Sequence, residues 1–182
     1  MSVEEKKIYT SEDYWKNGDK ERAELIYGDL VAMAPPSLTH QRIVHHLSRV
    51  IGQYIVDNKG ECQILQAPFA VNIDAKDENW VEPDVFVVCD RSKLTERACV
   101  GAPDLVIEVV SPSSRRMDYA VKMQLYLDSG VREYWIVDPS KKITLVFRFG
   151  SDISPAITSF DKELSVGIFP DLSIKISELL EL

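Results

Sequence analysis

The stretch DLVIEVVSPSS, residues 104–114, decides the fold because it predicts a strand that is buried on both faces. Side chains alternate along a strand, so Val106, Glu108 and Val110 share one face, while leucine, isoleucine and valine fill the other. Such a pattern is typical of an interior strand. The carboxylate of Glu108 on an apolar face is costly unless it is paired, protonated or bound to a cation.

The chain of 182 residues is predicted to form a single domain, residues 1–182, because helix and strand patterns alternate from end to end without a linker. No apolar run approaches the roughly 20 residues that span a bilayer. The start, MSVEEKK, lacks the apolar region of a signal peptide. We therefore expect a cytoplasmic protein without a membrane segment.

Charge and cysteine content limit the classes of function. The net charge of −8 opposes binding to a polyanion unless bound cations or a local basic surface offset it. The basic residues that could gather at such a surface are Arg42, Arg49, Arg115, Arg116 and Lys122. The cysteines, Cys62, Cys89 and Cys99, are odd in number and widely spaced, so we predict reduced thiols.

The first part of the chain predicts a short helix over residues 10–18 and a β-hairpin in AELIYGDLVAMA that turns at Gly28-Asp29. A longer helix begins after Ser37, a plausible N-cap, and ends near Asn58. The segment CQILQAPFAVNI, residues 62–73, is predicted to be a strand.

The second part predicts strands in EPDVFVVCD, DLVIEVVS and EYWIVDP, with a helix from about residue 115 to residue 128 that Gly130 closes. Further strands and a short terminal helix follow. The strand–helix–strand order around this helix favours a parallel pair. The predicted fold is α/β: a mixed β-sheet flanked by helices, with an N-terminal β-hairpin.

A second carboxylate accompanies Glu108. Asp84 alternates with Phe86 and Val88 on one face of its strand. If the two strands are neighbours, the carboxylates converge, and Mg²⁺ or Mn²⁺ between them would relieve their repulsion. For each acid alone a structural role is equally open: Asp84 capping a turn, Glu108 pairing with a basic residue.

Other Pro-Asp pairs fit a metal site less well. Asp104 shares a strand with Glu108 but lies ~13 Å away, and Asp171 has no second acid on its strand. Lys122, on the helix after the Glu108 strand, is the best cation near such a site, with Tyr126 one turn further on the same face. From spacing alone, Lys122 and Asp118 form a solvated i,i+4 ion pair.

These segments resemble the PD-(D/E)xK nuclease superfamily, and more closely its Uma2 family of restriction endonucleases. The phrases that carry the resemblance are AELIYGDLVAMAPPSLTHQRI, EPDVFVV and APDLVIEVVSPSSRRMDYAVKMQLYLDSGVREYWIVDP. The resemblance implies a restriction-endonuclease-like core in which Asp84 and Glu108 hold Mg²⁺ and Lys122 assists. Val110 stands where the superfamily usually has its lysine. Glu24 and His40 also match the family, as accessory residues or as structural ones.

The leading hypothesis is a metal-dependent endonuclease that hydrolyses phosphodiester bonds of DNA, with Asp84, Glu108 and Lys122 as catalytic residues and Glu24, His40 and Tyr126 as accessory residues. One alternative is a catalytically silent module of the same fold that binds a protein or nucleic-acid partner. Another is hydrolysis of a different phosphate ester, because the fold does not fix the substrate. The resemblance also makes a homodimer one possible state, because many enzymes of this fold cut as pairs.

Overall fold

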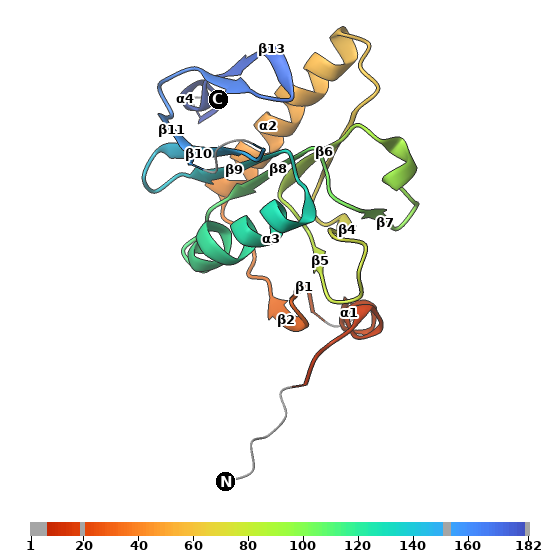
Figure 1. Ribbon diagram of the computed structural model, residues 1–182. Helices are drawn as coiled ribbons and strands as arrows, with labels where there is room; N and C mark the ends of the chain where they lie inside the picture. The colour runs from red at the N-terminus through yellow and green to blue at the C-terminus, as the bar shows by residue number, and fades with distance from the viewer. Residues whose placement is uncertain (1–6, 19–20, 151–153, 181–182) are drawn as a thin grey trace.

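A computed structural model describes residues 7–18, 21–150 and 154–180 (Figure 1). The helical segments are α1 Ser11–Gly18, α2 Leu38–Asp57, the 3-10 helix η1 Arg91–Lys93, the π-helix η2 Met117–Val121, α3 Lys122–Ser129 and α4 Ile176–Leu180. A six-stranded sheet has the order β11 Ala156–Ser159, β10 Ile143–Arg148, β9 Glu133–Asp138, β8 Leu105–Val109, β6 Val85–Val88 and β3 Gln63–Gln66.

Within the stretch DLVIEVVSPSS, Leu105–Val109 forms β8, and every residue of this strand is buried. β8 runs parallel to β9, with Glu108 opposite Ile136, and antiparallel to β6, with Ile107 opposite Val85. The remaining neighbours in this sheet are antiparallel. The predicted interior strand, the parallel pair and the mixed sheet are confirmed.

Two apolar layers cover the faces of the six-stranded sheet. On one face, α2 packs through Ile43, Leu47 and Ile51 beside the hairpin of β12 Leu164–Val166 and β13 Phe169–Ile174 and the terminal helix α4. On the other face, α3 contributes Leu125 and Tyr126. Figure 1 shows α2, β13 and α4 together, with α3 on the opposite side of β8 and β9. Among the described helices, none has the length and apolar character needed to span a bilayer.

A second sheet, which the sequence did not predict, lies beside the first. Its order is β2 Asp29–Ala32, β1 Ala23–Ile26, β5 Trp80–Val81, β4 Ala70–Asn72 and β7 Ala98–Val100. The predicted strand 62–73 is wrong as a single element. It divides into β3 and β4, which belong to different sheets, at a turn that contains Ala67-Pro68. Because proline lacks an N–H donor, it interrupts a strand ladder.

The predicted hairpin is confirmed, but its turn lies one residue earlier than expected. Ile26 pairs with Asp29, so Tyr27 and Gly28 form the turn, with φ of 50° and 74°. A two-residue turn with positive φ at both positions matches the right-handed twist of the strands. The predicted caps are also present: the Ser37 side chain accepts the His40 N–H at the start of α2, and Gly130, at φ 87°, ends α3.

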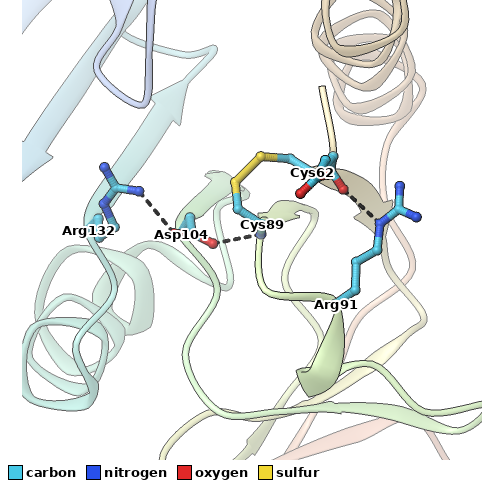
Figure 2. The surroundings of a disulfide bond; sticks show 6 residues. Cys62, Cys89, Arg91, Asp104 and Arg132 are labelled. Atoms are coloured by element: carbon cyan, nitrogen blue, oxygen red, sulfur yellow. Dashed lines mark hydrogen bonds and ion pairs between the residues drawn. A yellow bond between two sulfur atoms is a disulfide. The ribbon is translucent and has the colours of Figure 1, made fainter. Parts of the chain in front are cut away.

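The prediction of reduced thiols is wrong for Cys62 and Cys89, which form a disulfide (Figure 2). The register of β3 and β6 places Gln63 opposite Val88, so the cysteines just beyond these residues face each other. Asp104 accepts the Cys89 N–H at 2.8 Å. Wide spacing in the sequence gave no sign of this pairing, because it depends on which strands are neighbours. Cys99 is a buried free thiol.

Candidate active site

The two predicted metal ligands lie side by side. Asp84 directly precedes β6 and Glu108 lies near the end of β8, and the antiparallel register brings these positions together. The Val109 N–H donates to Oδ2 of Asp84 at 2.8 Å, and the Asp84 N–H donates to Oε2 of Glu108 at 3.4 Å. Both carboxylates line a cavity of about 380 Å³. The strand pairing therefore fixes the backbone under each acid.

Lys122, the first residue of α3, reaches the same place. Its Nζ lies 2.9 Å from Oε1 of Glu108 and 2.8 Å from Oε1 of Glu24, which comes from β1 in the second sheet. The Tyr126 hydroxyl donates to Oε1 of Glu108 at 2.6 Å. The Lys122 side chain is only 5% exposed. These contacts join three elements at one ammonium group.

Asp118 was expected to form a solvated ion pair with Lys122, and this expectation is wrong. Asp118 is buried within the π-helix η2, and its Oδ2 accepts the Ser114 hydroxyl at 2.6 Å. Lys122 instead forms ion pairs with Glu24 and Glu108. A π-helix has a wider turn than an α-helix, so the i,i+4 geometry assumed from the sequence does not hold across it. Asp118 also lines the cavity.

His40 contacts Asp84 from the first turn of α2. Its Nε2 lies 3.1 Å from Oδ2 of Asp84, and the ring lines the cavity. Its Nδ1 is buried and has no hydrogen-bond partner among the described residues. Asp84 thus receives a hydrogen bond from the Val109 backbone and a contact from a histidine ring on a different element.

A charged network that was not predicted from the sequence lies next to Glu24. The Glu82 N–H donates to Oε1 of Glu24 at 2.9 Å. Oε2 of Glu82 accepts hydrogen bonds from Arg22 Nε at 2.9 Å and Nη2 at 2.7 Å, and Oε1 accepts the Tyr14 hydroxyl at 3.2 Å. The signal was available: Arg22 stands two residues before Glu24, and Glu82 two residues before Asp84, so each pair shares a strand face.

The site holds more negative than positive charge. Burial raises the pKa of Glu108 well above its usual value; Lys122 opposes this rise, and the carboxylates of Asp84, Asp118 and Glu24 add to it. Burial also raises the pKa of Asp118 to about 6. For Lys122, burial acts to lower the pKa, but Glu108, Glu24 and Asp118 outweigh it and the pKa rises. Lys122 therefore remains a cation among several acids.

This donor set fits a hard divalent cation. Mg²⁺ usually takes one or two protein carboxylates, together with waters and substrate phosphates. Asp84 and Glu108 supply that share, and a cation beside them would offset the excess negative charge. In the part of the chain that the structure describes, no cluster of three or more His, Cys, Asp or Glu side chains is arranged to hold a metal. Other ligands would then come from water and substrate.

The basic residues expected to gather at one surface do not all do so. Lys122 is buried among carboxylates, and Arg115 binds Asp138 at 2.6 Å. Arg22 was not among the basic residues predicted to form this surface, but it lines the cavity.

The fold places the protein in the nuclease-fold class. A crystal structure described as a putative nuclease belonging to DUF820, from Anabaena variabilis, has a TM-score of 0.77 with 21% identity, and the match covers 94% of this chain and 97% of that one. This likeness confirms the predicted restriction-endonuclease-like α/β fold.

The model of the Uma2 family, described as "Putative restriction endonuclease", matches residues 9–177, and the chain belongs to this family. Two uncharacterized proteins of Synechocystis sp. are similar in sequence. One, sll1609, is 29% identical over 76% of this chain and 79% of its own length. The other, slr1290, is 27% identical over 72% of this chain and 67% of its own length.

Proposed function

We propose that the protein is a Mg²⁺- or Mn²⁺-dependent endonuclease that hydrolyses phosphodiester bonds of DNA. One observation carries the proposal: the carboxylates of Asp84 and Glu108, from neighbouring strands, face one cavity in which the Lys122 ammonium contacts Glu108. Membership of a family described as restriction endonucleases supports the same reaction class.

Asp84 and Glu108 are the residues that would hold the metal ion. A bound divalent ion supplies Lewis-acid stabilisation of phosphate charge and lowers the pKa of a coordinated water. The Val109 N–H and the His40 ring hold Asp84, while the Tyr126 hydroxyl holds Glu108. These contacts fix both carboxylates before substrate arrives, which is the preorganisation that electrostatic catalysis requires.

Lys122 takes the role of the lysine that Val110, directly after β8, replaces. Its ammonium is fixed by Glu24 and Glu108 at the cavity wall. A cation in this place stabilises negative charge that develops on the phosphate and favours the ionised form of a nearby water. Glu24 acts through Lys122 and is a positioning residue.

A plasmid-nicking assay in Mg²⁺ or Mn²⁺ tests the proposal. Wild-type protein should nick plasmid DNA, and Asp84→Asn and Glu108→Gln should each lower the rate by at least about 100-fold, since each removes a metal ligand. Asp171→Asn is the matched control, because this exposed aspartate also follows a proline but lies on β13. Cleavage that survives in Asp84→Asn would refute the assignment.

The silent-module alternative is favoured by one observation, the engagement of Lys122 by two carboxylates. A calorimetric titration separates the two functions. Mn²⁺ binding that requires Glu108, together with nicking, supports the nuclease. An absence of Glu108-dependent Mn²⁺ binding supports the silent module.

A further inference from the structure

We propose that Arg22 binds a phosphate of the substrate at the edge of the cavity, and that Glu82 and Tyr14 hold its guanidinium in place. The inference rests on the proposed function in taking the substrate to be a phosphodiester. It extends that function to a residue that contacts the substrate away from the two carboxylates.

Arg22 combines access with a fixed geometry. It lines the cavity that contains Asp84 and Glu108, and its side chain is 43% exposed. Its Nε and Nη2 both donate to Oε2 of Glu82. These bonds use one edge of the planar guanidinium, and Nη1 makes no hydrogen bond to the residues that the structure describes. Arginine is suited to phosphate because its rigid fork presents several donors in one plane.

The carboxylate that holds Arg22 is itself well supported. The Glu82 side chain is 9% exposed, and its second oxygen accepts the Tyr14 hydroxyl at 3.2 Å. The backbone N–H of Glu82 donates to Glu24, which in turn contacts Lys122. Arg22 is therefore tied to the same framework as the candidate catalytic lysine.

The charge of the cavity also points to Arg22. Among the described residues that line it, Arg22 and Lys122 carry permanent positive charge. Lys122 is 5% exposed and is engaged by two carboxylates, so its ammonium is poorly placed to attract a phosphate from solvent. Arg22 is accessible to solvent, and its Nη1 group can still donate hydrogen bonds. A phosphodiester that enters this acidic cavity needs such a group.

The test is binding of a fluorescein-labelled DNA oligonucleotide, single-stranded and duplex, measured by fluorescence anisotropy in EDTA. Arg22→Lys should weaken binding because it removes the fork while keeping the charge, and Arg22→Ala should weaken it by about tenfold or more. For Arg22→Ala, the slope of log K against log salt should fall by about one.

Arg132→Ala is the matched control. Arg132 is also an exposed arginine paired with a mostly buried acid, at 3.1 Å from Asp104, but it does not line the cavity. Thermal unfolding of each variant checks that Arg22→Ala remains folded; if it does not, Arg22→Lys carries the test. Equal affinity and equal salt slope for the Arg22 and Arg132 variants would overturn the inference, as would an absence of binding by the wild type.

EDTA prevents metal-dependent cleavage, so the anisotropy assay measures DNA binding alone and the nicking assay measures cleavage. A protein that binds through Arg22 but nicks nothing supports this inference and refutes the proposed function. A protein that nicks DNA with unchanged binding in the Arg22 variants supports the proposed function and refutes this inference.

Discussion

Lys122 Nζ lies 2.9 Å from Oε1 of Glu108, and this contact joins the start of α3 to the middle of the six-stranded sheet. Both side chains are about 5% exposed, so neither charge is compensated by water. A buried ion pair costs desolvation energy, and removing one partner leaves the other charge unpaired. We therefore expect the Lys122–Glu108 ion pair of the candidate site to affect the free energy of unfolding of the whole protein.

The first prediction concerns this contact. Lys122→Met should lower the free energy of unfolding by about 3 to 5 kcal/mol, because Glu24 and Glu108 lose their shared cation. Urea denaturation at neutral pH measures the change. Lys162→Met, at an exposed lysine, is the control. The double variant Lys122→Met/Glu108→Gln should recover part of the loss; a single variant as stable as wild type would contradict this account of the pair.

The second prediction concerns the pH dependence of Asp118. Burial raises the pKa of this carboxyl from 3.8 to about 6, so folding disfavours its ionised form. Stability from this group is present below pH 3.8 and is lost as the pH rises through 6. At pH 7.5 the free energy of unfolding of Asp118→Asn should therefore exceed that of the wild type by about 1 to 3 kcal/mol.

Urea denaturation at pH 7.5 and pH 4 checks the direction of this stability difference. The advantage of Asp118→Asn should shrink at pH 4, where the wild-type carboxyl is mostly protonated. Asp128→Asn, at an exposed aspartate of α3, should show no comparable advantage. A variant that is less stable than wild type at pH 7.5 would show that the ionised carboxylate is stabilising.

The third prediction concerns Asp138, at the end of β9. Its pKa is shifted in the opposite direction from that of Asp118. Burial acts to raise the pKa of this carboxyl, but hydrogen bonds from Ser140, Arg115 and Tyr119 outweigh it and bring the pKa to about 2. The stability that Asp138 contributes is present above pH 3.8 and is lost as the pH falls toward 2. Asp138→Asn should cost about 1 to 2 kcal/mol at pH 7. Acid titrations of both proteins, followed by circular dichroism, should converge near pH 2.

The fourth prediction concerns the disulfide between Cys62 and Cys89, which are 27 residues apart (Figure 2). A thiol assay in denaturant without reductant should detect one free thiol, Cys99, rather than three. Reduction should lower the free energy of unfolding by about 2 to 4 kcal/mol, because the unfolded chain regains conformational freedom. The variant Cys62→Ser/Cys89→Ser should not respond to reductant. Three free thiols in the untreated wild type would contradict the pairing.

Much of the fold could be predicted from local patterns. Alternation identified β8, the caps at Ser37 and Gly130 bounded two helices, and the strand–helix–strand order gave the parallel pair. The second sheet could not be predicted in this way. Its β5 and β7 have two and three residues, and β4 was hidden in a longer apolar run. Such short strands carry little periodic signal.

The candidate site was predictable where two strands are neighbours and was not where a side chain crosses between elements. Asp84 and Glu108 needed only the pairing of β6 with β8. The contact of Lys122 with Glu24 joins residues 98 positions apart in the sequence, so spacing did not reveal it. The sequence places Arg22 near Glu24 and Glu82 near Asp84, but the contact between Arg22 and Glu82 joins residues 60 positions apart, so spacing did not reveal their pairing.

We propose that Asp84 and Glu108 form a divalent metal site, and a crystal soaked in Mn²⁺ would reveal the ion itself. An anomalous difference map should show one peak within about 2 to 2.3 Å of a carboxylate oxygen of each residue, and the peak should be absent in Glu108→Gln. A map without a peak between these carboxylates, from crystals of a protein that nicks DNA in Mn²⁺, would contradict the claim.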